Sequence, residues 1–260
     1  MELVLIGLIA FLASGLALFS GFGLGTVLMP VFALFFPVPL SIAATAVVHF
    51  ANNIFKFWLM ERQADWQVVA RFSIPAMLTA FAGAVLLNMF DQMPLIGSYM
   101  LGGSMFEITV VKAVIGALIL LFVLLDLSPQ FQELALPPRW LPLGGALSGF
   151  FGGLSGNQGA LRSVFLIKAG LSKEAFVATG VVSAVLVDAT RLMVYGTGFL
   201  SGHLTESQEL ITPIIVATIC AFAGAFIGKL FLQKVTLRAI QIVIAAAMLL
   251  IGLGLIAGFV

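Results

Sequence analysis

Polar side chains that lie inside long apolar runs are the residues of this sequence best suited to chemistry. They gather in two glycine-rich stretches and in the apolar run after each: His49, Asn52, Asn53, Lys56, Asn157, Gln158, Arg162, Asp188 and Arg191. Because a polar group inside a membrane is costly, such residues are functional candidates by default. No Walker-type glycine loop accompanies them. The set predicts recognition of a small solute without ATP, any other cofactor or a metal, rather than enzymatic catalysis.

The second glycine-rich stretch predicts an anion-binding site. It reads Gly152-Gly153-Leu154-Ser155-Gly156-Asn157-Gln158-Gly159-Ala160-Leu161-Arg162. A helix that restarts near Gln158 would expose N–H groups and its positive dipole end, and Arg162 adds a planar donor fork suited to an oxyanion. The alternative is that the glycines only permit tight helix packing and that Arg162 snorkels to the membrane surface.

Three further residues are expected to orient the oxygens of a bound anion: Asn53, Asn157 and His49. His49 could also titrate, and a role in packing is equally open. Lys56 lies near the end of its apolar run, so it is expected to snorkel rather than to bind.

The spacing of Asp188 and Arg191 brings both side chains to one face of a helix. Two interpretations remain open. The pair could be a neutral internal ion pair that stabilises the fold, or a gate that opens when substrate competes for Arg191.

The composition places these residues in a membrane protein. Hydrophobic residues make up 62% of the 260 residues and charged residues only 9%, and the mean hydropathy is +1.19. A soluble protein carries about 25% charged residues, so this surface must face a lipid bilayer. The net charge of +1 argues against a nucleic-acid partner, and a single cysteine, Cys220, excludes a disulfide framework. The composition predicts an all-α polytopic membrane protein.

Two of the apolar segments are too long for one membrane crossing. The segments cover roughly 2–37, 40–60, 66–90, 107–126, 139–169, 172–198, 208–231 and 235–259. A crossing needs about 20 residues, and the first segment would make a helix of about 54 Å. Glycine clusters interrupt the two long segments, and we expect helix breaks at Gly21, Gly23, Gly25, Gly153, Gly156 and Gly159. Each long segment is therefore expected to turn back on itself.

The positions of lysine and arginine favour the same model. When both long segments turn back, the basic residues outside the membrane divide eight to one between its two sides. Positive charge marks the cytoplasmic side. The regions expected there are 61–65, 127–138, 169–173 and 229–238. Both termini and the loops 91–106 and 199–207 are expected outside.

The two halves of the chain resemble each other. Gly15, Gly25 and Thr45 precede Gly149, Gly159 and Thr179 by 134 residues. Each half holds one turning-back segment and three crossings, so the sequence predicts two inverted repeats, 1–126 and 139–260, joined by a cytoplasmic linker at 127–138. Two Gly-x-x-x-Gly pairs, which start at Gly224 and Gly254, are close-packing faces that could serve a homodimer.

The sequence resembles the sulfite exporter TauE/SafE family over nearly its whole length. The resemblance rests on the glycine-rich segment that ends in Pro30, on Ala43-Ala44-Thr45, and on the second glycine-rich segment with Ala178-Thr179. The second motif is a subgroup variant, since Gly159-Ala160-Leu161-Arg162 replaces the usual ending in proline. The resemblance implies export of small sulfur-containing anions, such as sulfite or a sulfonate, across a bacterial inner membrane.

Two alternatives stay open at this point. One is a proton-coupled importer of another small solute, such as a carboxylate. The other is an intramembrane serine protease, because Gly153-Leu154-Ser155-Gly156 matches its motif. The protease is disfavoured because the only later histidine, His203, lies in an expected external loop.

Overall fold

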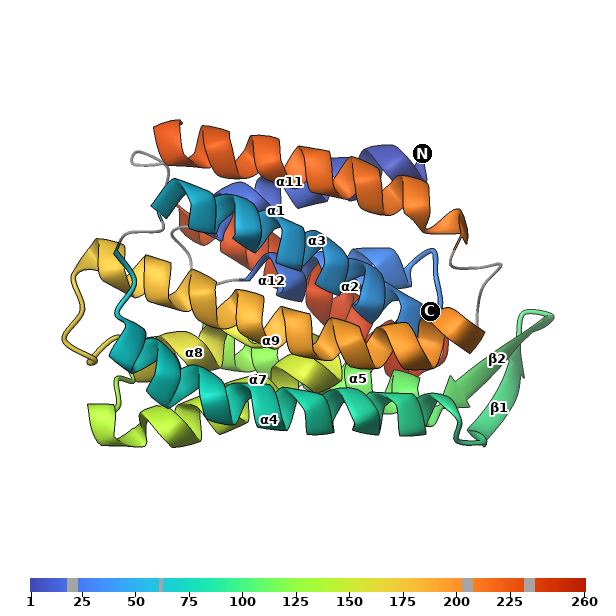
Figure 1. Ribbon diagram of the computed structural model, residues 1–260. Coiled ribbons are helices and arrows are strands. Elements are labelled where there is room, and N and C mark those ends of the chain that lie inside the picture. The colour runs from blue at the N-terminus through green and yellow to red at the C-terminus, as the bar shows by residue number, and fades with distance from the viewer. Residues whose placement is uncertain (18–22, 61–62, 203–207, 232–236) are drawn as a thin grey trace.

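The computed structural model describes residues 1–17, 23–60, 63–202, 208–231 and 237–260. Its helices form one bundle, with a small sheet at one end (Figure 1). The helices of the first half are α1 Glu2–Leu16, α2 Leu24–Ala33, α3 Val38–Met60, α4 Trp66–Asp91 and α5 Val110–Leu127. Those that follow are α6 Pro129–Gln132, η2 Pro138–Trp140, α7 Leu141–Ser155, α8 Gly159–Leu166, α9 Lys173–Gly202, α11 Ile211–Phe231 and α12 Leu237–Ile256.

The helices confirm an all-α polytopic membrane protein. Among the described residues, five helices are long and apolar enough to cross a membrane: Val38–Trp58, Trp66–Asp91, Val110–Leu127, Lys173–Thr197 and Ile211–Gly228. Shorter apolar helices accompany them at Glu2–Gly15, Leu24–Ala33 and Ile242–Ile256. Large apolar side chains such as Leu78 and Leu250 are exposed on the outside of the bundle, where they would contact lipid.

Both long apolar segments are broken into two helices. Gly156 has φ +82°, a left-handed conformation that ends α7, and α8 begins three residues later at Gly159. In the first segment, Gly23 is the residue before α2. The predicted break at Gly21 lies outside the described residues.

Two of the predicted breaks are wrong, because Gly25 lies in the first turn of α2 and Gly153 lies inside α7. Gly153 has a packing function instead. A Cβ there would come 2.1 Å from the carbonyl oxygen of Ala80 in α4.

Close packing of α7 on α4 depends on glycines four residues apart. A Cβ at Gly145 or Gly149 would lie 2.0 Å from the carbonyl oxygen of Phe72 or Ala76, respectively. A glycine also allows α11 to pack closely on α1, since a Cβ at Gly224 would lie 2.0 Å from the carbonyl oxygen of Phe11. Small residues allow helix backbones to approach in this way where lipid supplies no hydrophobic force.

The close-packing faces that the sequence suggested for a dimer are used within the chain. Gly224 faces α1, and a Cβ at Gly258 would lie 2.7 Å from the carbonyl oxygen of Glu107. A homodimer therefore stays a prediction that these glycines do not support.

The chain termini mark one end of the bundle. Both termini lie at the same end as the sheet, whereas the C-terminal end of α3 and the start of α9 lie at the opposite end (Figure 1).

Residues 91–106, expected as a loop, contain most of a β-hairpin. Strands β1 Leu95–Leu101 and β2 Ser104–Thr109 pair antiparallel. Gly102 and Gly103 join them with φ of +61° and +86°, which suits the two-residue turn that hairpins favour. The hairpin is anchored to the C-terminus, since the Tyr99 hydroxyl donates to the carbonyl oxygen of Ala257 at 2.6 Å.

Candidate functional site

A buried polar network joins α3, α9 and the break between α7 and α8. Its centre is Asp188, which is fully buried. One carboxylate oxygen, Oδ2, lies 2.6 Å from Nδ1 of His49 in α3. The other, Oδ1, accepts from Nε of Arg191 at 3.0 Å and from the side-chain amide of Gln158 at 3.1 Å. Three segments far apart in the sequence are thus tied to one carboxylate.

Arg191 also holds the broken end of α7. A helix that stops inside a protein leaves carbonyl groups without intrahelical donors. The Tyr195 hydroxyl donates to the carbonyl oxygen of Gly153, and Nη1 of Arg191 donates at 3.2 Å to that of Gly152, which also accepts from the N–H of Gly156. A cation at this position also opposes the negative end of the helix dipole. Asp188 and Arg191 therefore meet on one helix face, and Arg191 has a second set of contacts on α7.

The two helix breaks meet in the centre of the polar network. A Cβ at Gly25, in the first turn of α2, would lie 3.4 Å from the carbonyl oxygen of Gly156. It would also lie 3.7 Å from the ring of His49 and 3.8 Å from the methyl group of Thr45. These are ordinary van der Waals distances, so the start of α2 lies directly against the end of α7 and the ring of His49.

Arg162 lies just past the second break, in the first turn of α8. Its backbone N–H donates to the carbonyl oxygen of Gln158. Its side chain packs against Gly180 of α9, where a Cβ would lie 3.4 Å from Nε. The terminal nitrogen Nη1 is buried and has no hydrogen-bond partner among the described residues. A buried donor without a partner is costly, so this nitrogen is a candidate donor to a ligand.

Lys56 is buried rather than snorkelling, which corrects the expectation from sequence. Only 5% of the residue is exposed. It lies within electrostatic range of Arg162. No carboxylate in the described part of the chain forms a salt bridge with either cation, although Asp188 lies within electrostatic range of Arg162. The position near the end of α3 suggested an exposed amine, but α3 is covered on this face by the other helices.

Of the predicted asparagines, Asn53 and Asn157 bond within their own segments, whereas Asn52 bonds to another helix. The Asn53 amide lies 3.1 Å from Nδ1 of His49, one helical turn away. Asn157 donates to the hydroxyl of Ser155 at 3.2 Å. Asn52 accepts from Ser14 of α1 at 3.1 Å. All three are buried, but neither Asn53 nor Asn157 joins the Asp188 carboxylate directly.

Thr45 and Tyr195 belong to this region although sequence reasoning gave them no role in it. The Thr45 hydroxyl oxygen is buried without a hydrogen-bond partner in the described structure, and Thr45 lies one turn before His49 on α3. Its recurrence as Thr179 was the only signal available. Nothing in the spacing of Tyr195 indicates that its hydroxyl would reach α7.

The Ser155 environment does not resemble that of a nucleophile. Its hydroxyl donates to the carbonyl oxygen of Phe151 at 3.0 Å and accepts from Asn157. His203, which the protease interpretation would need, lies outside the described residues. Over the described part of the chain, no cluster of His, Cys, Asp and Glu side chains could hold a metal ion.

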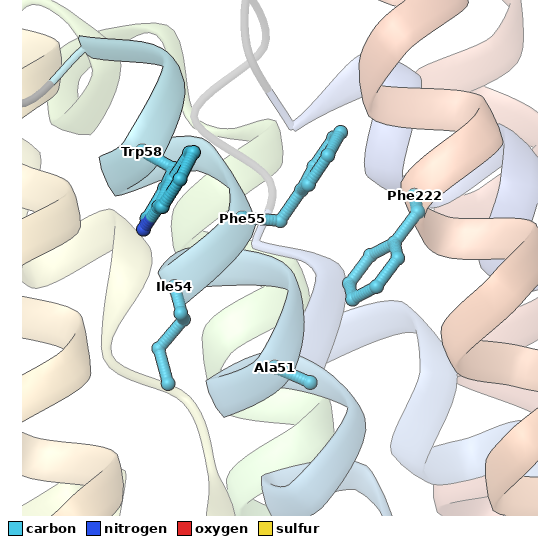
Figure 2. A pocket seen from close by; sticks show the side chains of 5 residues that line it. All are labelled: Ala51, Ile54, Phe55, Trp58 and Phe222. Carbon is cyan, nitrogen blue, oxygen red and sulfur yellow. The ribbon is translucent and has the colours of Figure 1, made fainter.

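A pocket of about 310 Å³ lies on the opposite face of α3 (Figure 2). Its lining is Ala51, Ile54, Phe55, Trp58 and Phe222. The α3 members are spaced to share one helix face, whereas His49, Asn53 and Lys56 share the other. Phe55 stacks on Phe222 of α11 with ring centroids 4.8 Å apart. Because the pocket lining is almost wholly apolar, it offers no set of donors for an anion.

Comparison with known proteins places the chain in one family. Neither the curated proteins nor the solved structures contain a match to it. The family model described as sulfite exporter TauE/SafE matches residues 6–255 of the 260. With the membrane-crossing helices, this match identifies a membrane anion transporter, and the chain belongs to the sulfite exporter TauE/SafE family.

Proposed function

We propose that this protein is a secondary transporter that exports small sulfur oxyanions, sulfite or a sulfonate, across the bacterial inner membrane. Membership in the family supports the substrate class. The observation that carries the proposal is the buried, unpartnered Nη1 of Arg162 beside a second buried cation, Lys56. Two cations without a carboxylate partner among the described residues suit an anionic ligand.

The start of α8 would complete the anion site. Its first N–H groups have no intrahelical acceptors, and the dipole places partial positive charge there. Arg162 lies in this first turn, so its fork and the backbone donors can bind the same anion. The unpartnered hydroxyl of Thr45 and the buried amides of Asn53, Asn157 and Gln158, with His49 beside them, would orient the oxygens.

Asp188 and Arg191 would transmit anion binding to α7. Arg191 contacts both Asp188 and the end of α7, and Asp188 contacts Gln158 at the start of α8. An anion bound at α8 would compete with Asp188 for these donors. Release of the Gly152 carbonyl by Arg191 would then free the end of α7, which is the gating step that we propose.

Two inverted repeats, 1–126 and 139–260, would supply alternating access. The packing pattern supports this division. The first helix of each half packs against the second full-length crossing of the other half, α1 against α11 and α7 against α4. The glycine contacts correspond too: Gly83 of α4 meets Phe150 of α7, and Gly224 of α11 meets Phe11 of α1. The direction of transport would follow the membrane potential, which drives an anion outward by about 2.3 kcal/mol per charge per 100 mV.

The test is anion binding and flux with purified protein in proteoliposomes. A panel of radiolabelled sulfite, sulfoacetate and a simple carboxylate distinguishes sulfur oxyanions from carboxylates. Arg162→Gln should reduce affinity by about 2–5 kcal/mol, because it truncates a buried charged contact. Arg162→Lys keeps the charge without the planar fork and should retain part of the transport.

The matched control is Arg71→Gln, which removes the same charge from an exposed position on α4. It should leave affinity unchanged. Wild-type affinity in correctly folded Arg162→Gln protein would reject the anion site, and selective transport of the carboxylate would reject the substrate class.

A further inference from the structure

We propose that His49 is a proton-binding site that couples each transported anion to one proton. The inference rests on the proposed anion site and goes beyond it, since it assigns the coupling ion. His49 lies in the interior of the bundle, 6% exposed, with Nδ1 2.6 Å from Oδ2 of Asp188. Imidazole is the side chain whose charge changes near neutral pH.

The contacts of His49 can hold a proton on Nδ1. A protonated Nδ1 donates to the Asp188 carboxylate in a short, charge-assisted bond. The Asn53 amide, one turn along α3, lies beside the same ring. On its other side the ring faces Gly25 of α2, so only the first turn of that helix separates it from the first break.

The charges around His49 connect its protonation to the anion. Within electrostatic range in the described structure are Asp188 and Arg191 from α9 and Arg162 from α8, while Lys56 lies two turns along α3. Arg191 already balances Asp188 in its ion pair. Arg162 and Lys56 then leave two positive charges, and a proton on His49 would make three. A bound anion offsets this excess and therefore favours the proton.

Such coupling is reciprocal by thermodynamic linkage. If the anion favours protonation of His49, protonation must favour binding of the anion by the same factor. Couplings between two sites commonly change affinity by roughly 5- to 150-fold. The two ligands would cross the membrane together. An inward proton gradient would then oppose export, and the membrane potential would act only on the negative charge that the proton does not offset.

The first experiment measures protons and anions together in proteoliposomes. Sulfoacetate is the probe, because its acid groups stay ionised near neutral pH, whereas sulfite itself titrates there. The membrane potential is clamped at zero and an enclosed pH dye reports protons. Wild-type protein should move about one proton per sulfoacetate and bind it about tenfold more tightly at about pH 6 than at about pH 8. Sulfoacetate flux without proton flux would overturn the proposal.

The second experiment observes His49 directly. The chain contains only two histidines, so histidine labelled with ¹⁵N gives a simple spectrum that His203→Gln assigns. Saturating sulfoacetate at fixed pH should convert His49 nitrogens from the neutral to the protonated form. A His49 signal that keeps its protonation state in the saturated protein would overturn the proposal without any need for a variant at His49.

The variant His49→Gln separates a proton site from a packing role. Whatever flux remains in this variant should no longer depend on the pH gradient, and retained dependence would overturn the proposal. Ile54→Val, on the exposed apolar face of α3, is the control and should keep the wild-type proton ratio. Absence of flux for every anion in wild-type protein would instead reject the proposed function, and this inference with it.

Discussion

Asp188 shows how one buried carboxylate can organise the centre of a transporter. It contacts His49, Gln158 and Arg191. Together with Asp188, these residues come from three segments of the chain. A buried charge is tolerated only when it is paired and hydrogen-bonded, and here every partner is itself buried. The network therefore specifies how α3, α9 and the second break fit together.

Removal of Arg191 alone should destabilise the protein strongly. Arg191→Met leaves the Asp188 charge without its main partner and removes one of the two donors to the Gly152 carbonyl, at a cost of about 3–5 kcal/mol. Adding Asp188→Asn removes the uncompensated charge, so the double variant should lose less stability than the sum of the two single variants. Thermal unfolding in detergent measures the difference.

Additivity of the two substitutions would show that the residues do not interact. Arg71→Met is the matched control for loss of an arginine, because Arg71 is exposed on α4. It should unfold close to the wild-type temperature.

At the scale of the helices, the spacing of glycines decides how closely two helices pack. Gly145, Gly149 and Gly153 place one face of α7 directly on carbonyl oxygens of α4. Glycine has a low helix propensity in water, yet α7 is continuous from Leu141 to Ser155. The close approach of the two backbones explains why glycines occur in α7, although helix propensity alone would disfavour them.

Gly149→Ala should therefore separate α7 from α4. Its Cβ would meet the carbonyl oxygen of Ala76 at 2.0 Å, and that atom belongs to a backbone that cannot move away alone. Overpacking typically costs about 1–3 kcal/mol. The expected result is a lower unfolding temperature and a smaller yield of monodisperse protein in size-exclusion chromatography.

Gly196→Ala is a control within the same structure. Gly196 lies inside α9, and no atom lies within 4 Å of a Cβ built there. This variant should be neutral or slightly stabilising, since alanine favours a helix. Equal unfolding temperatures for Gly149→Ala and Gly196→Ala would contradict the packing argument.

The whole molecule has two distinct ends. The termini and the hairpin mark one end, and the C-terminal end of α3, α6 and the start of α9 mark the other (Figure 1). The eight-to-one distribution of basic residues predicts that the second end is cytoplasmic.

Cysteine labelling tests this orientation. In a Cys220→Ala background, Ser98→Cys in the hairpin should react with an impermeant thiol reagent in intact cells. Gln130→Cys in α6 should react only after the membrane is opened. Both positions are exposed in the structure. Burial of one of the two side chains therefore would not explain a difference in labelling. The opposite labelling pattern would invert the proposed topology.

Much of the architecture could be predicted from the sequence because it depends on local properties. Apolar length determines where a helix can cross, and the two overlong segments do break into paired helices. The spacing of Asp188 and Arg191 placed them on one helix face, where they form an ion pair 2.8 Å apart. The hairpin was missed although Gly102-Gly103 is a turn signal, because the residues on either side of it do not alternate regularly between apolar and polar.

Only the tertiary structure decided which of these residues meet. His49 and Asp188 are 139 residues apart, and no local pattern links them. Gly153 lies in a glycine-rich stretch that suggests a helix break, but its role depends on the neighbouring backbone of α4, which a single sequence does not display. Lys56 likewise changed from a surface amine to a buried cation because other helices cover its face of α3. Helix positions follow from local chemistry, whereas contacts between helices depend on how the whole bundle excludes lipid.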